Sequence, residues 1–270
     1  MTTLLAVHVD SEQDNIPITT RVELPLYFFG RNSETTARTF CNNTRMSQDE
    51  PIVRIERGDE LYAKVREFGN GLRPIDAGRG WFYQVVSELL DATLYNYRHL
   101  KMSYKKKDYP RLGWACRNLL ELTIFTKYVL ISAANARRFG QDRLVDGWDI
   151  IRSLKALELH YTPKSDTSLL DDALSRMQAQ MRLEGVAETQ YLRANVLADV
   201  VGMRADYTYI NRVCSKLVHP TAWSLLAMNK EDNSFSQSLE MFFGYGVMYL
   251  GEVYLAIKTH DETHGMKPSP

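Results

Sequence analysis

Residues 81–104 read WFYQVVSELLDATLYNYRHLKMSY, and this stretch decides the fold class of the chain. Its apolar residues recur three or four positions apart, at Phe82, Val85, Val86, Leu89, Leu90, Ala92 and Tyr97. That spacing is the period of an α-helix with one buried face. The stretch therefore predicts one long helix, and from Trp81 onward the pattern of the chain is helical.

Further helices are predicted downstream from the same period. The next one has Asp108 as its N-cap and Pro110 in its first turn, and it runs to about Arg138, where Gly140 is expected to stop it. The remaining ones are predicted over Asp142–His160, Asp166–Glu184, Asp199–Val218 and Ser234–Lys258. The chain from residue 81 is thus expected to form a bundle of about six helices.

Residues 1–78 follow a different pattern. Short runs rich in Val, Ile, Leu, Tyr and Phe are separated there by polar stretches, which is typical of strands and turns. These runs are Leu4–Val9, Val22–Phe29, Ile52–Glu56 and Leu61–Val65. With Gly58 and Asp59 as a hairpin turn, they predict a small region of three or four strands.

The sequence therefore predicts a mainly α protein, a multi-helix bundle with a small β-rich N-terminal region. Glycines between residues 69 and 80 mark the boundary between the two. The expected organisation is a β-rich region at 1–78, a helical bundle domain at 79–259 and a polar, flexible tail at 260–270.

The composition bounds the class of protein. The chain has 270 residues with 33 basic and 33 acidic side chains, and 44% of its residues are hydrophobic, so a wholly disordered or fibrous protein is excluded. Three cysteines without CxxC spacing favour the reducing cytoplasm over a disulfide framework or zinc knuckle. The N-terminus lacks the basic start of a secretory signal. Residues 241–257 are shorter than the ~20 apolar residues of a membrane-spanning helix. We expect a cytoplasmic protein with no membrane contact, metal or cofactor.

Basic residues gather between Tyr97 and Arg117, where the only acid is Asp108. They are Arg98, Lys101, Lys105, Lys106, Lys107, Arg111 and Arg117, interleaved with Tyr97, Tyr104, Tyr109 and Trp114. Lys and Arg neutralise phosphates while aromatic rings stack on bases, so this composition suits a polyanion-binding face. A solvated helix–helix corner is the alternative, since residues 105–108 also read as a loop.

Arg117 and Glu121 form a second candidate feature. They lie four residues apart on the face of the second helix that carries Trp114, Ile124 and Tyr128. Two charges on a covered face are tolerable only if they pair or meet other polar groups. They are either an internal bridge that fixes helix packing or part of a functional site.

Residues 209–220 read YINRVCSKLVHP and form the third feature. Ile210, Val213, Cys214 and Leu217 make an apolar stripe, and the opposite side carries Tyr209, Arg212, Ser215, Lys216 and His219. Arg212 and His219 lie two helical turns apart on one face and can act on one substrate group. Pro220 disfavours helical geometry at His219, so the imidazole is expected at the helix C-terminus, where the helix dipole favours its protonated form. A general acid or a capping histidine fits this position.

Two resemblances follow from these residues. The spacing from Arg212 to His219 is compatible with the Arg-x(4–6)-His signature of HEPN ribonucleases, although Val213 stands where those enzymes usually have a polar residue. Residues 80–258 also resemble a family of uncharacterised bacterial helical proteins, a domain of unknown function. The matching residues are the segment 117–121 and Tyr209, Ser215, His219, Pro220 and Thr221. This resemblance implies a helical bundle in which Arg117, Glu121 and His219 converge.

The first functional hypothesis is a HEPN-like, metal-independent endoribonuclease or RNA-targeting toxin of antiviral defence. His219 would exchange protons with the ribose 2′-hydroxyl or the leaving oxygen, and Arg212 would stabilise charge on the phosphate. The expected roles of the others are charge stabilisation by Lys216 or Arg117, orientation of a basic group by Glu121, and RNA binding by Tyr209, Lys101, Lys105, Lys106, Lys107 and Arg111. A homodimer is expected by analogy.

The second hypothesis is a non-catalytic helical interaction module. Arg117, Glu121 and His219 would then form a buried polar network that fixes the helix register, and residues 1–78 would contact a protein partner. The two hypotheses differ in whether His219 is open to solvent or packed against protein groups.

Overall fold

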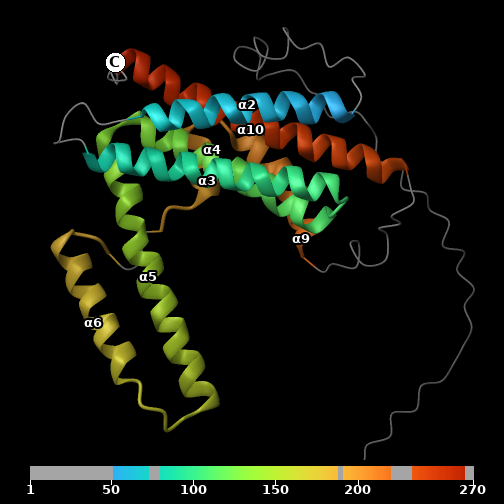
Figure 1. Ribbon diagram of the computed structural model, residues 1–270. Coiled ribbons are helices and arrows are strands. Elements are labelled where there is room, and N and C mark those ends of the chain that lie inside the picture. Colours follow the sequence, from blue (N-terminus) through green and yellow to red (C-terminus); the bar gives the residue numbers. More distant parts are fainter. Residues whose placement is uncertain (1–50, 73–79, 188–190, 220–232, 265–270) are drawn as a thin grey trace, which may run out of the picture. The chain divides into compact units, whose positions relative to one another are not determined.

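The computed structural model describes residues 51–72, 80–187, 191–219 and 233–264 (Figure 1). The chain divides into two units between Gln48 and Asp49, and every described residue belongs to the second unit. The predicted strands Leu4–Val9 and Val22–Phe29 lie outside the described residues.

The described residues are almost entirely helical, and no strand occurs among them, so the mainly α prediction is confirmed. The long helices are α2 (Pro51–Gly71), α3 (Gly80–Lys105), α4 (Tyr109–Ile131), α5 (Ala133–Tyr161), α6 (Ser168–Leu183) and α10 (Asn233–His264). Between α6 and α10 lie the short elements α7 (Ala194–Val200), α8 (Arg204–Asp206), the π-helical turn η2 (Tyr207–Asn211) and α9 (Arg212–Val218). No described helix has the length and apolarity that crossing a bilayer requires.

Residues 51–71 are helical, so the strands predicted at Ile52–Glu56 and Leu61–Val65 and the turn at Gly58 are wrong. The residues of α2 that are at least partly buried recur with the helical period, at Ile55, Gly58, Asp59, Leu61, Tyr62, Val65, Phe68 and Gly69. Gly58 is needed for close approach to α3, because a Cβ at this position would lie 2.3 Å from the hydroxyl of Tyr97. The ring of Tyr62 stacks on Tyr97 with a centroid distance of 5.5 Å.

α4 is the central helix of the bundle. It packs against α3, α5, α9 and α10, and its sequence begins as expected, with the Asp108 side chain accepting a hydrogen bond from the Arg111 N–H at 3.3 Å. The predicted end near Arg138 is wrong. Ser132 adopts an extended backbone and its side chain caps α5 by accepting from the Asn135 N–H. The cap ends α4 at Ile131, and Gly140 lies inside α5.

α5 and α6 run side by side as an antiparallel pair (Figure 1). They have a small core of their own, separate from the main one, formed by Leu144, Val145, Trp148, Met181 and Val186. The predicted helix Asp166–Glu184 corresponds closely to α6. The start of α5 also joins the main core, where Ala136 is buried.

Two further helix predictions need correction. The single helix predicted over Asp199–Val218 is broken after α7, because Gly202 adopts a positive φ of 71° that ends the helical path. The flexible tail predicted from His260 is wrong for residues 260–264, which continue α10. The ring of His260 lies 5.5 Å from that of Phe82, so this part of α10 is held against α3.

Candidate functional site

A close contact between α4 and α9 builds the centre of the site. A Cβ on Gly113 would lie 3.0 Å from the Cβ of Leu217 and 3.4 Å from the carbonyl oxygen of Cys214. Glycine at this position lets the two helices approach each other, and Cys116, Cys214 and Leu217 are buried between them. A hydrogen bond with the neighbouring thiol of Cys214, together with burial, raises the pKa of Cys116. The contact fixes α9 beside the polar face of α4.

Arg117 joins the two helices at this contact. Its Nε donates to Glu121 Oε1 at 3.1 Å, and its Nη1 donates to Ser215 Oγ of α9 at 3.4 Å. Both members of the Arg117–Glu121 ion pair are half-buried. The expected pairing of Arg117 with Glu121 is therefore confirmed, and the bond to Ser215 is an addition that the spacing along α4 could not reveal.

Tyr207 in the π-helical turn is a further member of this cluster, and the sequence did not predict it. Burial raises the pKa of Tyr207, the charge of Glu121 raises it further, and Arg117 and Arg204 lower it. The charges of the Arg117–Glu121 pair therefore act on the phenol of Tyr207. π-Helical turns are frequent at functional sites because they change the register of a helix locally.

The polar face of α9 is open to solvent. Arg212, Lys216 and His219 are exposed and Ser215 is half-buried, while Cys214 and Leu217 are buried. Tyr209, in η2, is also exposed. Val213 was expected in the apolar stripe, but 39% of it is exposed.

His219 lies at the end of α9, as Pro220 predicted. Its φ of −90° and ψ of 142° are extended values, and its N–H donates to the Ser215 carbonyl oxygen at 3.1 Å. Ser215 thus contacts Arg117 through its side chain and His219 through its backbone. The structure places His219 one turn beyond the residue that Arg117 contacts.

Basic residues near the end of α3 and in the following turn line a shallow surface cavity. Arg98, Lys101, Met102, Lys105 and Lys106 line this cavity of about 270 Å³. Lys105, Lys106 and Lys107 are exposed. Carboxylates partly neutralise the positive charges of two other residues predicted to bind phosphate. Lys101 pairs with Asp59, and Arg111 Nε lies 3.5 Å from Asp108 Oδ2.

The aromatic residues of this surface differ from the prediction. Tyr97, Tyr104 and Tyr109 are buried in the bundle, so they cannot contact a ligand there. Burial raises the pKa of Tyr97 first, and the nearby charge and hydrogen bond of Asp59 raise it further. Of the four predicted aromatics only Trp114 is exposed.

Tyr95 and His99 of α3 take the place of the buried tyrosines. Tyr95 is 48% exposed and Trp114 is 38% exposed. The ring of His99 lies between them, with centroid distances of 4.4 Å to Tyr95 and 5.9 Å to Trp114. We call Tyr95, His99 and Trp114 the aromatic surface. Arg98 flanks it, with its guanidinium 5.8 Å from the Tyr95 ring centre.

The aromatic surface adjoins the Arg117 cluster along α4. Trp114 precedes Arg117 by three residues, so the two side chains are neighbours on the helix surface. Beneath them the Asn118 Nδ2 of α4 donates to Asn96 Oδ1 of α3 at 3.0 Å, which ties the two helices together. The exposed ring of Trp114, the half-buried Arg117 and the polar face of α9 therefore follow one another from α4 to α9.

A second polar cluster lies between α4, α8 and α10. Lys127 pairs with Glu252 at 2.7 Å, and the Tyr249 hydroxyl donates to Asp206 Oδ1 at 3.3 Å. Burial is the main reason that the pKa of Asp206 is raised. Each of these four side chains has a partner on another element, so the cluster serves to hold the helices in register.

Among the described residues, no group of three or more His, Cys, Asp or Glu side chains is placed to hold a metal ion. No family model, curated protein or solved structure matches the chain. The resemblances to HEPN ribonucleases and to the bacterial helical family therefore stay predictions.

Proposed function

We propose that the protein binds single-stranded RNA on the α3–α4 surface and cleaves it without a metal ion. One observation carries the proposal. Arg117 contacts Ser215 one turn before His219, and this contact adjoins an exposed surface of rings and basic side chains. The proposal is supported because groups suited to phosphate chemistry neighbour a ring suited to base binding.

Base stacking is the binding mode that the aromatic surface supports. Rings that present a face or edge to solvent stack on nucleobases irrespective of sequence, and each stacked base contributes about 1–3 kcal/mol. Arg98 and the exposed Lys105, Lys106 and Lys107 can neutralise phosphates along the same strand. Bases in a duplex are already stacked on one another, so single-stranded RNA is the expected form.

Cleavage would follow from attack by the ribose 2′-oxygen on the adjacent phosphorus. The bond from phosphorus to the 5′-oxygen breaks, protonated His219 gives its proton to that oxygen, and the 2′-hydroxyl proton leaves to water. The products are a 2′,3′-cyclic phosphate and a 5′-hydroxyl. Arg212 and Arg117 stabilise the charge that develops on the phosphate, and Glu121 holds the Arg117 guanidinium in place.

The test is a cleavage assay on a labelled single-stranded RNA in EDTA. His219→Ala removes the proton donor and is expected to lower the rate by about 10²–10⁴-fold. His160→Ala is the matched control, because His160 is an exposed histidine at the end of α5. Cleavage that is absent from the parent protein, or that survives His219→Ala, refutes the cleavage proposal.

A non-catalytic interaction module is the second candidate, and the internal bonding of Arg117 favours it. Because Arg117 is bonded to both Glu121 and Ser215, its main role would then be to hold α9 on α4. Arg117→Ala would cost about 1–3 kcal/mol of unfolding free energy, with no activity to lose. An Arg117→Ala protein as stable as the parent contradicts this candidate. The proposed partner contact through residues 1–78 falls largely outside the described residues.

A further inference from the structure

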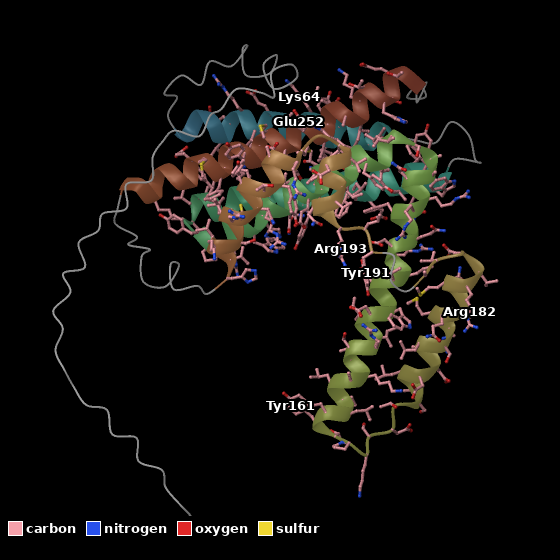
Figure 2. All side chains as sticks on the ribbon, turned by 180° about the vertical axis from the view of Figure 1, so that it is seen from behind. Lys64, Tyr161, Arg182, Tyr191, Arg193 and Glu252 are labelled. Carbon is pink, nitrogen blue, oxygen red and sulfur yellow. The ribbon has the colours of Figure 1, made fainter. Side chains whose placement is uncertain are left out.

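Helix α5 carries a row of exposed apolar side chains that none of the described elements covers. Ile150, Leu154, Leu157 and Tyr161 are 60%, 51%, 53% and 77% exposed. We call these four residues the α5 seam. Figure 2 shows Tyr161 at the end of α5, on the side opposite α6. Single exposed apolar residues are ordinary, but four in one row form a patch of a size that marks an interaction surface.

The spacing of the seam is that of a helix–helix interface. Its residues follow one another at intervals of four, three and four, which is the a/d pattern of a coiled coil. The opposite face of α5 is already covered, since Leu144, Val145 and Trp148 are buried against α6 and the chain after it. α5 therefore has two apolar faces, and α6 accounts for only one.

We infer that the α5 seam is a homodimer interface in which the α5 helices of two copies pack antiparallel. The charges at the two ends of the seam identify a second copy as the partner. Asp146 lies on the seam one turn before Ile150, and Lys164 follows Tyr161; both are exposed, and neither forms an ion pair within the described residues. An antiparallel pair centred between residues 155 and 156 sets Ile150 opposite Tyr161 and Leu154 opposite Leu157. Asp146 of each copy then lies opposite the turn that follows α5 in the other copy, and this turn carries Lys164.

The same register accounts for the next charge along the helix. Arg143, exposed one turn before Asp146, would face the segment between α5 and α6 of the second copy, which carries the exposed Asp166. A parallel pair would instead place Asp146 beside Asp146, and like charges at such positions are destabilising. The charge pattern therefore selects the antiparallel orientation.

The size of the seam indicates a reversible dimer. Each of its side chains exposes on the order of 100 Å² of apolar surface, so about 800 Å² of apolar side chain would be covered in the pair. Stable interfaces usually bury about 1,200–2,000 Å² in all. With the polar flanks added, the pair reaches the lower end of that range, so we expect dissociation in the micromolar range.

Sedimentation velocity on the full chain tests the inference, with protein from about 1 to about 200 µM. The parent protein is expected to shift from monomer to dimer over this range. Leu154→Glu/Leu157→Glu is expected to raise the dimer dissociation constant at least about 100-fold, because four carboxylates would be buried per dimer. Val196→Glu, at an exposed apolar residue of α7, is the matched control and should leave the dimer unchanged.

A charge exchange tests the orientation. Asp146→Lys and Lys164→Asp should each weaken the dimer about two- to fivefold at low salt, and the two substitutions together should restore it. Far-UV circular dichroism checks that each variant is folded, as expected for exposed positions. A parent protein that stays monomeric at every concentration overturns the inference, and so does a dimer that Leu154→Glu/Leu157→Glu leaves intact. If the variant with both substitutions does not recover the dimer affinity of the parent protein, the antiparallel arrangement is refuted.

Discussion

Replacement of Gly246 by alanine is the sharpest test of how the bundle is packed. Gly246 lies in α10 where this helix meets α3. A Cβ there would lie 2.3 Å from Cδ2 and 2.8 Å from Cδ1 of Leu100, well inside van der Waals contact. Leu100 is completely buried, so its side chain has no open space to move into. Gly246→Ala must therefore separate the two helices or force Leu100 from its rotamer.

Two opposing effects determine the change in unfolding free energy that Gly246→Ala causes. Overpacking a filled core costs about 1–3 kcal/mol, and two contacts this short put Gly246→Ala near 3 kcal/mol. Alanine recovers about 1 kcal/mol of helix propensity relative to glycine. The net loss of unfolding free energy is about 2 kcal/mol, which corresponds to a fall in Tm of roughly 4–8 °C.

Gly244 provides the control in the same helix. A Cβ at Gly244 would meet nothing within 4 Å, so Gly244→Ala gains helix propensity without a clash and should stabilise the protein by about 0.5–1 kcal/mol. Urea denaturation followed by circular dichroism measures both variants. The expected difference between them is about 3 kcal/mol. Equal unfolding free energies for the two variants would refute the packing of α10 on α3 described above.

Three further predictions concern the site, a helix cap and a buried carboxyl group. Trp114→Ala should weaken binding of single-stranded RNA roughly tenfold in fluorescence anisotropy, because a stacked base is lost; Ile131→Ala, at an exposed residue of the same helix, should not. Ser132→Ala removes the oxygen that accepts from the Asn135 N–H, so urea denaturation should show a loss of about 1 kcal/mol. Burial raises the pKa of Asp206 above 3.8, so the folded state binds this proton more tightly than the unfolded state, and stability falls as pH rises through the raised pKa. Asp206→Asn should therefore melt at a higher temperature than the parent near pH 7, and the gain should shrink toward about pH 4; a pH-independent gain would contradict this.

The long helices could be predicted because their signal is local. α3 repeats its apolar period over seven turns, and Asp108 with Pro110 marks the start of α4. The strands assigned to residues 52–65 failed because windows of four or five residues fit alternation and helical period equally well. Gly58 looked like a turn, but its role depends on contact with Tyr97, 39 positions later in the chain, and no local pattern shows such a contact.

The site shows the same division between local and distant contacts. Arg117 and Glu121 are four residues apart, so their pairing could be predicted, whereas the bond from Arg117 to Ser215 depends on the crossing of α4 and α9. The sequence did contain enough information to predict which aromatic side chains of α3 are buried and which are exposed. Tyr97 and Tyr104 continue the spacing of the buried apolar residues of α3, while Tyr95 and His99 lie four apart on its other face. Counting the helical period through to the end of α3 would have placed all four side chains on the right faces.

The proposed RNA surface and the α5 seam belong to different cores, and this makes their functions separable. Trp114 and Arg117 stand on α4, whose buried residues are part of the main core, whereas the seam is the outer face of a helix pair held by its own small core. Substitutions in groups with no shared partners change free energies additively. Loss of the dimer should therefore leave the RNA affinity of each copy unchanged. Two linked surfaces can still raise the overall affinity for a long RNA that reaches both, because the second contact becomes intramolecular. Dimerisation through α5 would then favour long single strands over short ones without any change at His219.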